Sequence, residues 1–234
     1  MSYFGLALSA MLVAQAGPGL WVHECDRVDL RVESPADEAL GQELAAVACA
    51  HAERLQRLFG RQSRGRIRIE IAADMQAWQR QTGRSWQIGA ALVCERIILQ
   101  PARSLRRMQD PDRAVAHELV HLMIRRTVGR ACPRWLDEGL ADRLSGAPGS
   151  GSGGALPDER GLAELERRLG LPDRRVSRAQ RLADYRLCRA LVDELARQVG
   201  VERLVAALPG LRQVKRPLDL ELHGRSLRQR LFGG

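Results

Sequence analysis

The spacing of hydrophobic and polar residues predicts β-strands in the first half of the chain. Residues 66–71, Arg-Ile-Arg-Ile-Glu-Ile, alternate strictly and predict one strand. Residues 21–32 alternate less regularly and are expected to form another strand, and residues 89–99 are expected to form one or two more. Between the first two of these segments, an apolar stripe with helical spacing predicts a long helix from about residue 35 to residue 59 that ends at Gly60.

The remaining predicted elements are helices. They cover residues 74–81, residues 113–124, a segment that begins at Pro133, and residues 158–169, 178–199, 201–208 and 225–232. The order of strands and helices predicts an α+β fold in which helices back a small mixed sheet. We expect one domain over residues 17–234, with a sheet-bearing N-terminal lobe at about residues 17–128 and a helical C-terminal lobe at about residues 133–234.

The helix predicted over residues 113–124 carries a metal-binding pattern. His117 and His121 are four residues apart, so both imidazoles project from one face of the helix, where they can share a tetrahedral Zn²⁺. Glu118 follows the first histidine and is rotated from it by about 100° around the helix axis. This offset keeps its carboxylate off the metal but within reach of a water bound there, which is the position of a general base.

A catalytic zinc site needs a third protein ligand and a fourth position that stays open. A metzincin would supply a third histidine six residues after His121, but that position is Thr127. The alternative is Glu138, which lies off the apolar stripe of the helix that is predicted to begin at Pro133. Asp142 follows one turn later, where it can accept a hydrogen bond from a ligating imidazole and fix its tautomer.

Two segments together resemble a known family of enzymes. They are His117-Glu118-x-x-His121 and the segment Trp-Leu-Asp-Glu-Gly-Leu-Ala-Asp that ends at Asp142. This combination resembles the gluzincin metallopeptidases, and most closely the compact bacterial peptidase MA-like family, which implies a zincin-like fold. The resemblance is sharp over residues 113–144 and looser from about residue 66 to the C-terminus. Position by position, it implies zinc ligands at His117, His121 and Glu138, the general base at Glu118, and the carboxylate partner of the first histidine at Asp142.

The resemblance also implies how substrate and transition state are held. In the family, a tyrosine on the helix after the glutamate ligand donates to the developing oxyanion, and the segment around Tyr185 is similar to that helix. His223 is the rival donor, and the alternative for Tyr185 is a packed ring with its hydroxyl in water. Gly89, Ala90 and Ala91 resemble the edge strand that pairs with a peptide substrate; an interior strand with small side chains is the alternative.

We therefore expect a zinc metallopeptidase with one Zn²⁺ per chain and a peptide or protein substrate. The sequence departs from the family at Asp137, where many relatives have Asn, and in the short gap between the second histidine and Glu138. The alternatives are a structural zinc closed by Cys132, a zinc-stabilised binding protein without activity, and an enzyme that hydrolyses a non-peptide amide such as a cell-wall linkage. Glu118 argues against the binding protein without activity, because a purely structural site has no use for a base. The sequence does not indicate an oligomeric state.

The composition narrows the choice of partners. The chain of 234 residues carries a net charge of +9, almost wholly on arginine, since Lys215 is the only lysine. The arginines are dispersed and no aromatic stacking motif accompanies them, so we expect no binding to nucleic acid. No apolar run of about 18 residues follows the N-terminal segment, so we expect no membrane span once that segment is removed.

The N-terminal segment and the cysteines point to export. Residues 1–16 contain an apolar stretch followed by small residues and are expected to be a signal peptide, which implies a periplasmic or extracellular protein. An uncleaved anchor and an ordinary strand are the alternatives. Five cysteines allow two disulfides, and we expect Cys25 to pair with Cys49, with small buried thiols as the alternative. Residues 145–157 are rich in Gly, Ser and Pro and are expected to form a flexible loop, either a surface insertion or a lid.

Overall fold

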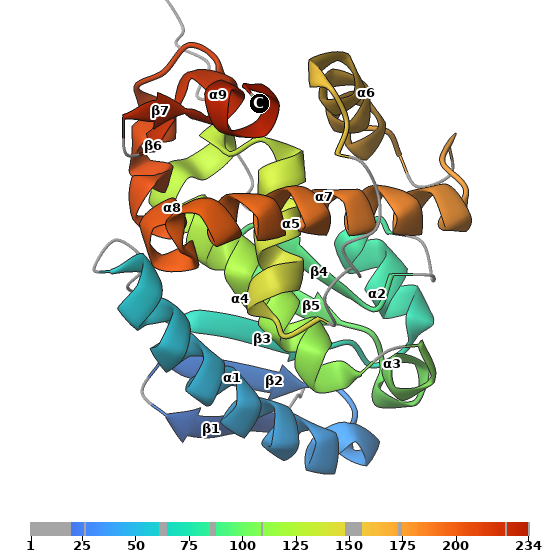
Figure 1. The fold of residues 1–234 in the computed structure, drawn as a ribbon. Coiled ribbons are helices and arrows are strands. Elements are labelled where there is room, and N and C mark those ends of the chain that lie inside the picture. The colour runs from blue at the N-terminus through green and yellow to red at the C-terminus, as the bar shows by residue number, and fades with distance from the viewer. Residues whose placement is uncertain are drawn as a thin grey trace, which may run out of the picture.

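The computed structural model describes residues 20–25, 27–60, 65–84, 88–108, 110–147, 156–172, 175–222 and 224–233. These residues form an α+β protein with a small mixed sheet and many helices (Figure 1). The expected signal peptide at residues 1–16 lies outside the described residues. The same holds for His223 and for most of the loop expected at residues 145–157.

The elements follow one another in the order that the hydrophobic pattern predicts. In the first half they are β1 (Leu20–Cys25), β2 (Val28–Val32), the 3₁₀ turn η1 (Pro35–Asp37), α1 (Glu38–Phe59), β3 (Ile67–Ile71), α2 (Met75–Thr82), β4 (Ala90–Val93), β5 (Arg96–Leu99) and α3 (Ala102–Met108). In the second half they are α4 (Pro111–Val128), η3 (Gly129–Ala131), α5 (Arg134–Leu144), α6 (Glu159–Leu169), α7 (Arg178–Val199), α8 (Val201–Ala207), η5 (Leu208–Arg212), η6 (Pro217–Asp219), β6 (Glu221–Leu222), β7 (Arg225–Ser226) and α9 (Leu227–Phe232).

Three details differ from the expectations. Residues 21–32 were expected to form one strand, but the chain reverses after Cys25 and the segment forms the antiparallel pair β1 and β2. The sequence at this reversal contains no glycine turn signal, and the alternation of apolar and polar residues continues through it. The pattern therefore did not mark the end of the first strand. The short helix α3 and the small β6–β7 hairpin were not expected, and residues 225–226, expected to begin the last helix, form β7 instead.

The main sheet has the strand order β1-β2-β3-β5-β4. The three middle strands are parallel, and β1 and β4 are each antiparallel to their single neighbour. Parallel strands that are covered on both faces are expected to be largely apolar, and here β2, β3 and β5 are each mostly buried. Among the described residues, β4 is the last strand on its side of the sheet.

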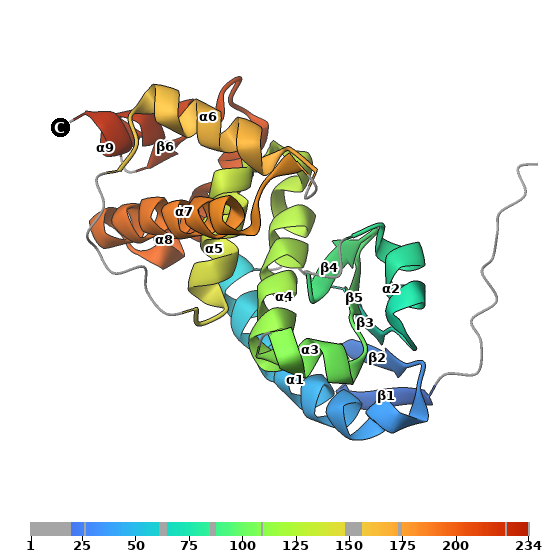
Figure 2. The ribbon, with the colours of Figure 1, turned by 90° about the vertical axis from the view of Figure 1, so that its right-hand side faces the viewer.

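Helices cover the two faces of this sheet unequally. Figure 2 shows α1, α3 and α4 on one face and α2 on the other. The larger core lies on the first face, where the isoleucines of β3 belong to the same buried cluster as the apolar residues of α1 and α4. On the second face, Trp78 of α2 forms a small separate cluster with Ala91 and Ile98. The sheet therefore fixes the position of α4, the helix with the metal-binding pattern.

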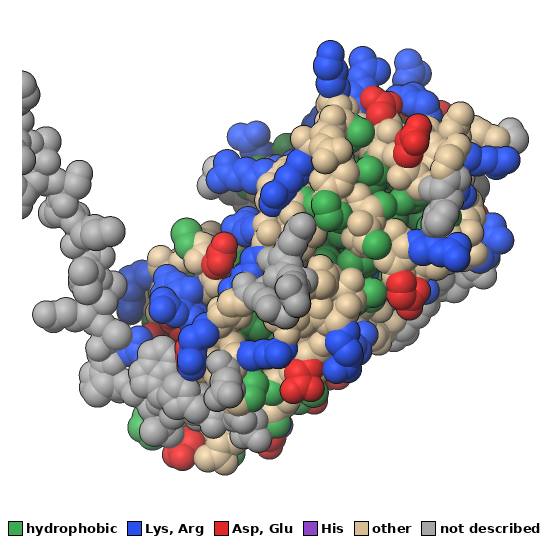
Figure 3. All heavy atoms as spheres, turned by 90° about the vertical axis from the view of Figure 1, so that its left-hand side faces the viewer, with side chains coloured by type: hydrophobic (Ala, Val, Ile, Leu, Met, Phe, Trp, Pro, Cys, Tyr) green, Lys and Arg blue, Asp and Glu red, His purple; other side chains and the backbone are tan. Residues whose placement is uncertain are grey.

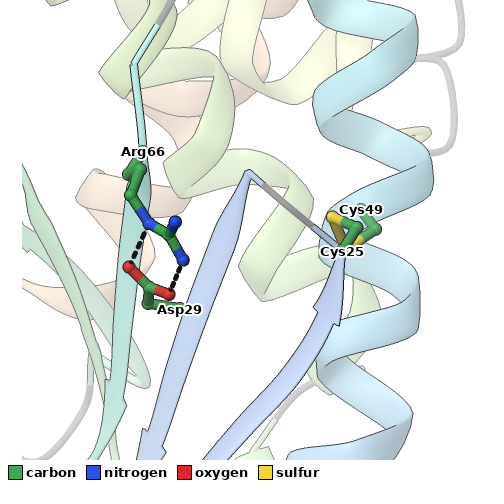
Figure 4. Close-up of a disulfide and its surroundings, with 4 residues drawn as sticks. All are labelled: Cys25, Asp29, Cys49 and Arg66. Atoms are coloured by element: carbon green, nitrogen blue, oxygen red, sulfur yellow. Dashed lines mark hydrogen bonds and ion pairs between the residues drawn. A yellow bond between two sulfur atoms is a disulfide. The ribbon is translucent and has the colours of Figure 1, made fainter.

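A disulfide joins the first strand to the first helix. Cys25 at the end of β1 is bonded to Cys49 on α1, as predicted, and Figure 4 shows the bond beside the start of β2. Arg66, just before β3, binds both carboxylate oxygens of Asp29 on β2. The edge of the sheet that lies away from β4 is thus held by covalent and ionic contacts. Cys94, Cys132 and Cys188 are free thiols.

The C-terminal helices pack on other helices rather than on the main sheet: α6 and α7 contact α5, and α8 contacts α1 and α7. The most extensive helix–helix contact is between α5 and α7, and its close approach depends on Gly139. A Cβ atom at this position would lie 2.4 Å from the backbone oxygen of Cys188 and 2.5 Å from Cγ2 of Val192. Only a glycine lets the two backbones approach this closely.

Positive charge is spread over the surface. On the face shown in Figure 3, Lys and Arg side chains outnumber Asp and Glu and are distributed over the whole face rather than collected in one tract. No helix in the described part of the chain combines the length and the apolar character that a membrane crossing requires.

Candidate metal centre

Helix α4 positions the two histidines. It begins after Asp110, whose side chain accepts a hydrogen bond from the backbone N–H of Asp112, and Pro111 occupies its first turn. It ends at Gly129, which has a positive φ of 66°. One side of the helix is buried in the main core, so the other side, with His117 and His121, is held towards a cavity.

Helix α5 presents the carboxylates. Its apolar residues face the core as the sequence predicts; they are Trp135, Leu136, Leu140 and Leu144. Its first turn is held by Glu166 of α6, whose two carboxylate oxygens accept hydrogen bonds from the backbone N–H groups of Arg134 and Trp135 at 3.0 and 3.1 Å. The close contact at Gly139 fixes α5 against α7. The neighbouring residue Glu138 is therefore held towards α4.

Three side chains converge on one point. Nε2 of His117 lies 3.1 Å from Nε2 of His121. Oε2 of Glu138 lies 3.6 Å from the first nitrogen and 3.5 Å from the second. A tetrahedral zinc with bonds of about 2.0–2.1 Å holds neighbouring ligand atoms about 3.3 Å apart. The three observed separations lie close to this value, so the residues could hold a metal ion with little rearrangement.

Each histidine is oriented by its own carboxylate. Nδ1 of His117 lies 3.3 Å from Oδ1 of Asp142, the partner that the sequence suggests. Nδ1 of His121 lies 2.7 Å from Oδ1 of Asp137, a role that the sequence analysis missed. A carboxylate on Nδ1 keeps the proton on that nitrogen and leaves Nε2 free to bind a metal. The available signal was the position of Asp137, directly before the glutamate of the cluster.

The electrostatics of the cluster reflect this arrangement. Burial would lower the pKa of His117, but contacts with Asp142 and Glu138 outweigh it and raise the pKa to about 9. Burial would also lower the pKa of His121, but Asp137 and Glu138 outweigh this effect and raise the pKa well above its usual value. Burial would raise the pKa of Glu138, but the neighbouring His121 charge and hydrogen bonds from both imidazoles hold it well below the usual range. Both imidazoles therefore hold their protons more tightly than usual, and a divalent cation that binds there would displace them.

Comparison with known proteins found no family model, no curated protein and no solved structure that matches the chain. Within the described residues, His117, His121 and Glu138 are the one group of His, Cys, Asp and Glu side chains that could hold a metal ion. Two imidazoles and a carboxylate are a donor set that suits zinc and leaves one position open. Cys132 lines the same cavity but does not belong to the group. The arrangement thus gives no support to a site closed by a thiol.

The cluster opens into a cavity of about 690 Å³. Glu118 and Tyr185, the two residues predicted to act in catalysis, both line it. No described residue forms a hydrogen bond or ion pair with the carboxylate of Glu118. The cavity also reaches β4 on one side and the helices α5, α6 and α7 on the other, so both lobes of the chain contribute to it.

Strand β4 offers backbone groups along one side of the cavity. Ala90 and Ala91 line it, as does Leu92. Gly89 lies just before the strand and is not among the lining residues; its carbonyl accepts a hydrogen bond of 2.9 Å from Gln100. In this antiparallel register, Gly89 and Ala91 face β5, so the N–H and C=O groups of Ala90 and Leu92 point away from it. Of the three residues predicted for substrate pairing, Ala90 is the one whose backbone faces the free edge.

Proposed function

We propose that the protein is a zinc-dependent metallopeptidase of the zincin type that binds one Zn²⁺ on His117, His121 and Glu138. The observation that carries the proposal is the set of three ligand atoms 3.1–3.6 Å apart. They lie in a cavity that also contains Glu118 and an edge strand. The motif resemblance to gluzincins agrees with this arrangement.

The protein residues have separate tasks in this mechanism. Bound zinc supplies a Lewis acid that polarises a carbonyl and lowers the pKa of a water to about 7. The Glu118 carboxylate accepts a proton from the attacking water and later donates it to the nitrogen of the leaving amine. The Tyr185 hydroxyl donates a hydrogen bond to the oxygen that gains negative charge. Asp142 and Asp137 keep both imidazoles in the tautomer that presents Nε2.

The edge strand favours a peptide as the substrate. An extended peptide can add to β4 by hydrogen bonds to the outward backbone groups of Ala90 and Leu92. Small side chains at positions 90 and 91 leave room for this approach. A substrate held in this way extends along the cavity past the zinc ligands.

An exported location is part of the proposal. A disulfide such as Cys25–Cys49 persists in oxidising compartments. This bond agrees with the signal peptide expected at residues 1–16. We therefore place the enzyme in the periplasm or outside the cell.

The Glu118→Gln variant tests the assignment. It removes the base but keeps the shape of the side chain and all three ligands, so it should bind one zinc per chain yet lose hydrolysis of a peptide library by about 10²-fold or more. The matched control is Glu95→Gln, which makes the same change at a largely exposed carboxylate outside the cavity lining. Zinc content is measured by elemental analysis and cleavage by mass spectrometry. Peptide cleavage that survives Glu118→Gln at the wild-type rate would exclude this mechanism.

A further inference from the structure

The cavity around the metal centre is rich in arginine. Five arginines line it, namely Arg84, Arg125, Arg130, Arg134 and Arg181. Its acidic lining residues are Glu118, Asp137, Glu138 and Glu166, and under the proposed function the first three serve the metal and the reaction. Glu166 uses both oxygens to bind the start of α5. Of these carboxylates, Glu166 is the one that also pairs with a lining arginine, in a long contact of 3.7 Å with Arg134.

Three of these arginines lie at one end of the metal centre. The helices α4 and α5 are antiparallel where they meet, since His117 contacts Asp142 and the later residue His121 contacts the earlier residue Glu138. One turn further towards the connection between the helices, the same faces carry Arg125 on α4 and Arg134 on α5. Arg130 lies in the connection itself, the 3₁₀ turn η3. All three residues line the cavity, and the backbone positions of Arg125 and Arg134 lie about one helical turn of 5.4 Å beyond His121 and Glu138.

Some arginines among the described residues form ion pairs with carboxylates, and others are exposed and form none. Typical pairs are Arg66–Asp29, Arg96–Glu70 and Arg168–Asp184. In contrast, Arg125 and Arg130 are exposed, and their side chains have no hydrogen bond or ion pair with any described residue. Arg134 is 59% exposed, and its ion pair with Glu166 is long at 3.7 Å. Their charges are available to a bound molecule.

We infer that the site selects substrates that carry a carboxylate on the side of the scissile bond nearest the α4–α5 connection, where Arg125 and Arg134 bind it, with Arg130 adding positive charge. This inference rests on the proposed function and specifies its substrate class. An arginine fork matches a carboxylate with two parallel hydrogen bonds, whereas an amide of the same shape gains no such ionic contact. The carboxylate comes either from an Asp or Glu side chain or from the C-terminus of the peptide.

Binding to the zinc-loaded Glu118→Gln protein tests the inference separately from catalysis. Labelled heptapeptides carry Glu or Gln at one position in turn, each with either a free or an amidated C-terminus, and their Kd values are measured by fluorescence anisotropy. We expect Glu at one position, or the free C-terminus, to tighten binding by about 10–100-fold, the range of a hydrogen-bonded charge. Preference for Glu identifies a side-chain carboxylate, and preference for the free C-terminus identifies a terminal one.

The variant pair isolates the arginines. Arg125→Gln/Arg134→Gln, in the same background, should abolish this preference while the neutral peptides keep their affinity. The matched control Arg57→Gln/Arg103→Gln removes the same charge from exposed positions on α1 and α3 and should keep the preference. Equal affinity for Glu and Gln peptides, and for free and amidated C-termini, would overturn the inference, as would a preference that survives loss of Arg125 and Arg134. Cleavage by the wild-type protein is scored independently. A carboxylate preference without any cleavage supports the anion site and refutes the peptidase.

Discussion

The contact between α5 and α7 at Gly139 is expected to set the position of the candidate metal centre. In Gly139→Ala, the new Cβ would lie 2.4 Å from the backbone oxygen of Cys188 and 2.5 Å from Cγ2 of Val192. Relaxed contacts of this kind lie at about 3.5 Å, so the two helices must separate by about 1 Å. Part of the obstacle is backbone, which cannot rotate away as a side chain can.

The cost of this separation can be worked out from the contact. Overpacking of a tight interface costs about 3 kcal/mol when the obstacle is rigid. Replacing a helical glycine with alanine returns up to about 1 kcal/mol through helix propensity. The net loss is about 2 kcal/mol, which lowers Tm by about 4–8 °C for a domain of this size.

The same movement should weaken zinc binding. Glu138 precedes Gly139, and ligand distances must hold to about 0.2 Å, so a 1 Å displacement of α5 should reduce zinc affinity at least about tenfold. Tm is measured by calorimetry on the apo protein, and affinity by competition with a chromophoric chelator. The control Gly170→Ala adds a Cβ 3.2 Å from the flexible end of Arg134 and 3.3 Å from the backbone oxygen of Arg167, at a residue with an ordinary φ of −80°. These contacts are far less close than those at Gly139, so it should change stability by no more than about 0.5 kcal/mol.

A second variant separates the two obstacles. Val192→Ala in the Gly139→Ala background removes the methyl group but leaves the Cys188 carbonyl, so neither Tm nor zinc affinity should recover. A Gly139→Ala protein with wild-type Tm and wild-type zinc affinity would refute the argument that this close contact positions the site.

The other predictions concern the carboxylate behind the second histidine, the disulfide and the tyrosine. Asp137→Ala removes the 2.7 Å contact with His121 and should lower zinc affinity by about 10–100-fold, measured by chelator competition. Asp137→Asn keeps an acceptor and should lose less; equal affinity in both variants and the wild type would contradict this role. Replacing Cys25 and Cys49 with Ser opens a link between residues 24 apart and should cost about 3 kcal/mol, or about 6–12 °C in Tm, whereas an unchanged Tm would contradict it. Tyr185→Phe should reduce kcat by about 10²–10³-fold with zinc affinity intact, and a wild-type kcat would remove Tyr185 from the mechanism.

Local spacing in the sequence accounts for much of the candidate metal centre. His117 and His121 share a face because an α-helix repeats every 3.6 residues, and this holds whatever the helix packs against. Glu138 could be chosen because the apolar stripe of its helix left it on a different face. The strand at residues 66–71 follows from strict alternation in the same way, and the structure confirms it as β3. These predictions depend only on the periods of the regular elements.

Other features depended on contacts between distant residues. The short helix α3 begins at Ala102, whose backbone N–H is bound by the side chain of Asp37, 65 positions earlier in the chain. No local sequence pattern could predict a hydrogen bond between residues so far apart in the chain. Residues 90–93 could not be assigned to an edge or an interior strand from the sequence, because the order of strands is set by pairing and not by composition.

The sequence by itself determined which residue types could bind a metal and on which helices they stand. The tertiary structure decided how those helices meet: it brought Glu138 within 3.5 Å of His121 and paired that histidine with Asp137. It also placed the arginines at and beside the α4–α5 connection along the cavity that the candidate metal centre lines. The physical reason is that the two kinds of feature depend on residues at different separations along the chain. Helical and strand periods are properties of neighbouring residues, whereas the distance between two helices is fixed by the packing of their whole surfaces, down to the missing side chain of Gly139.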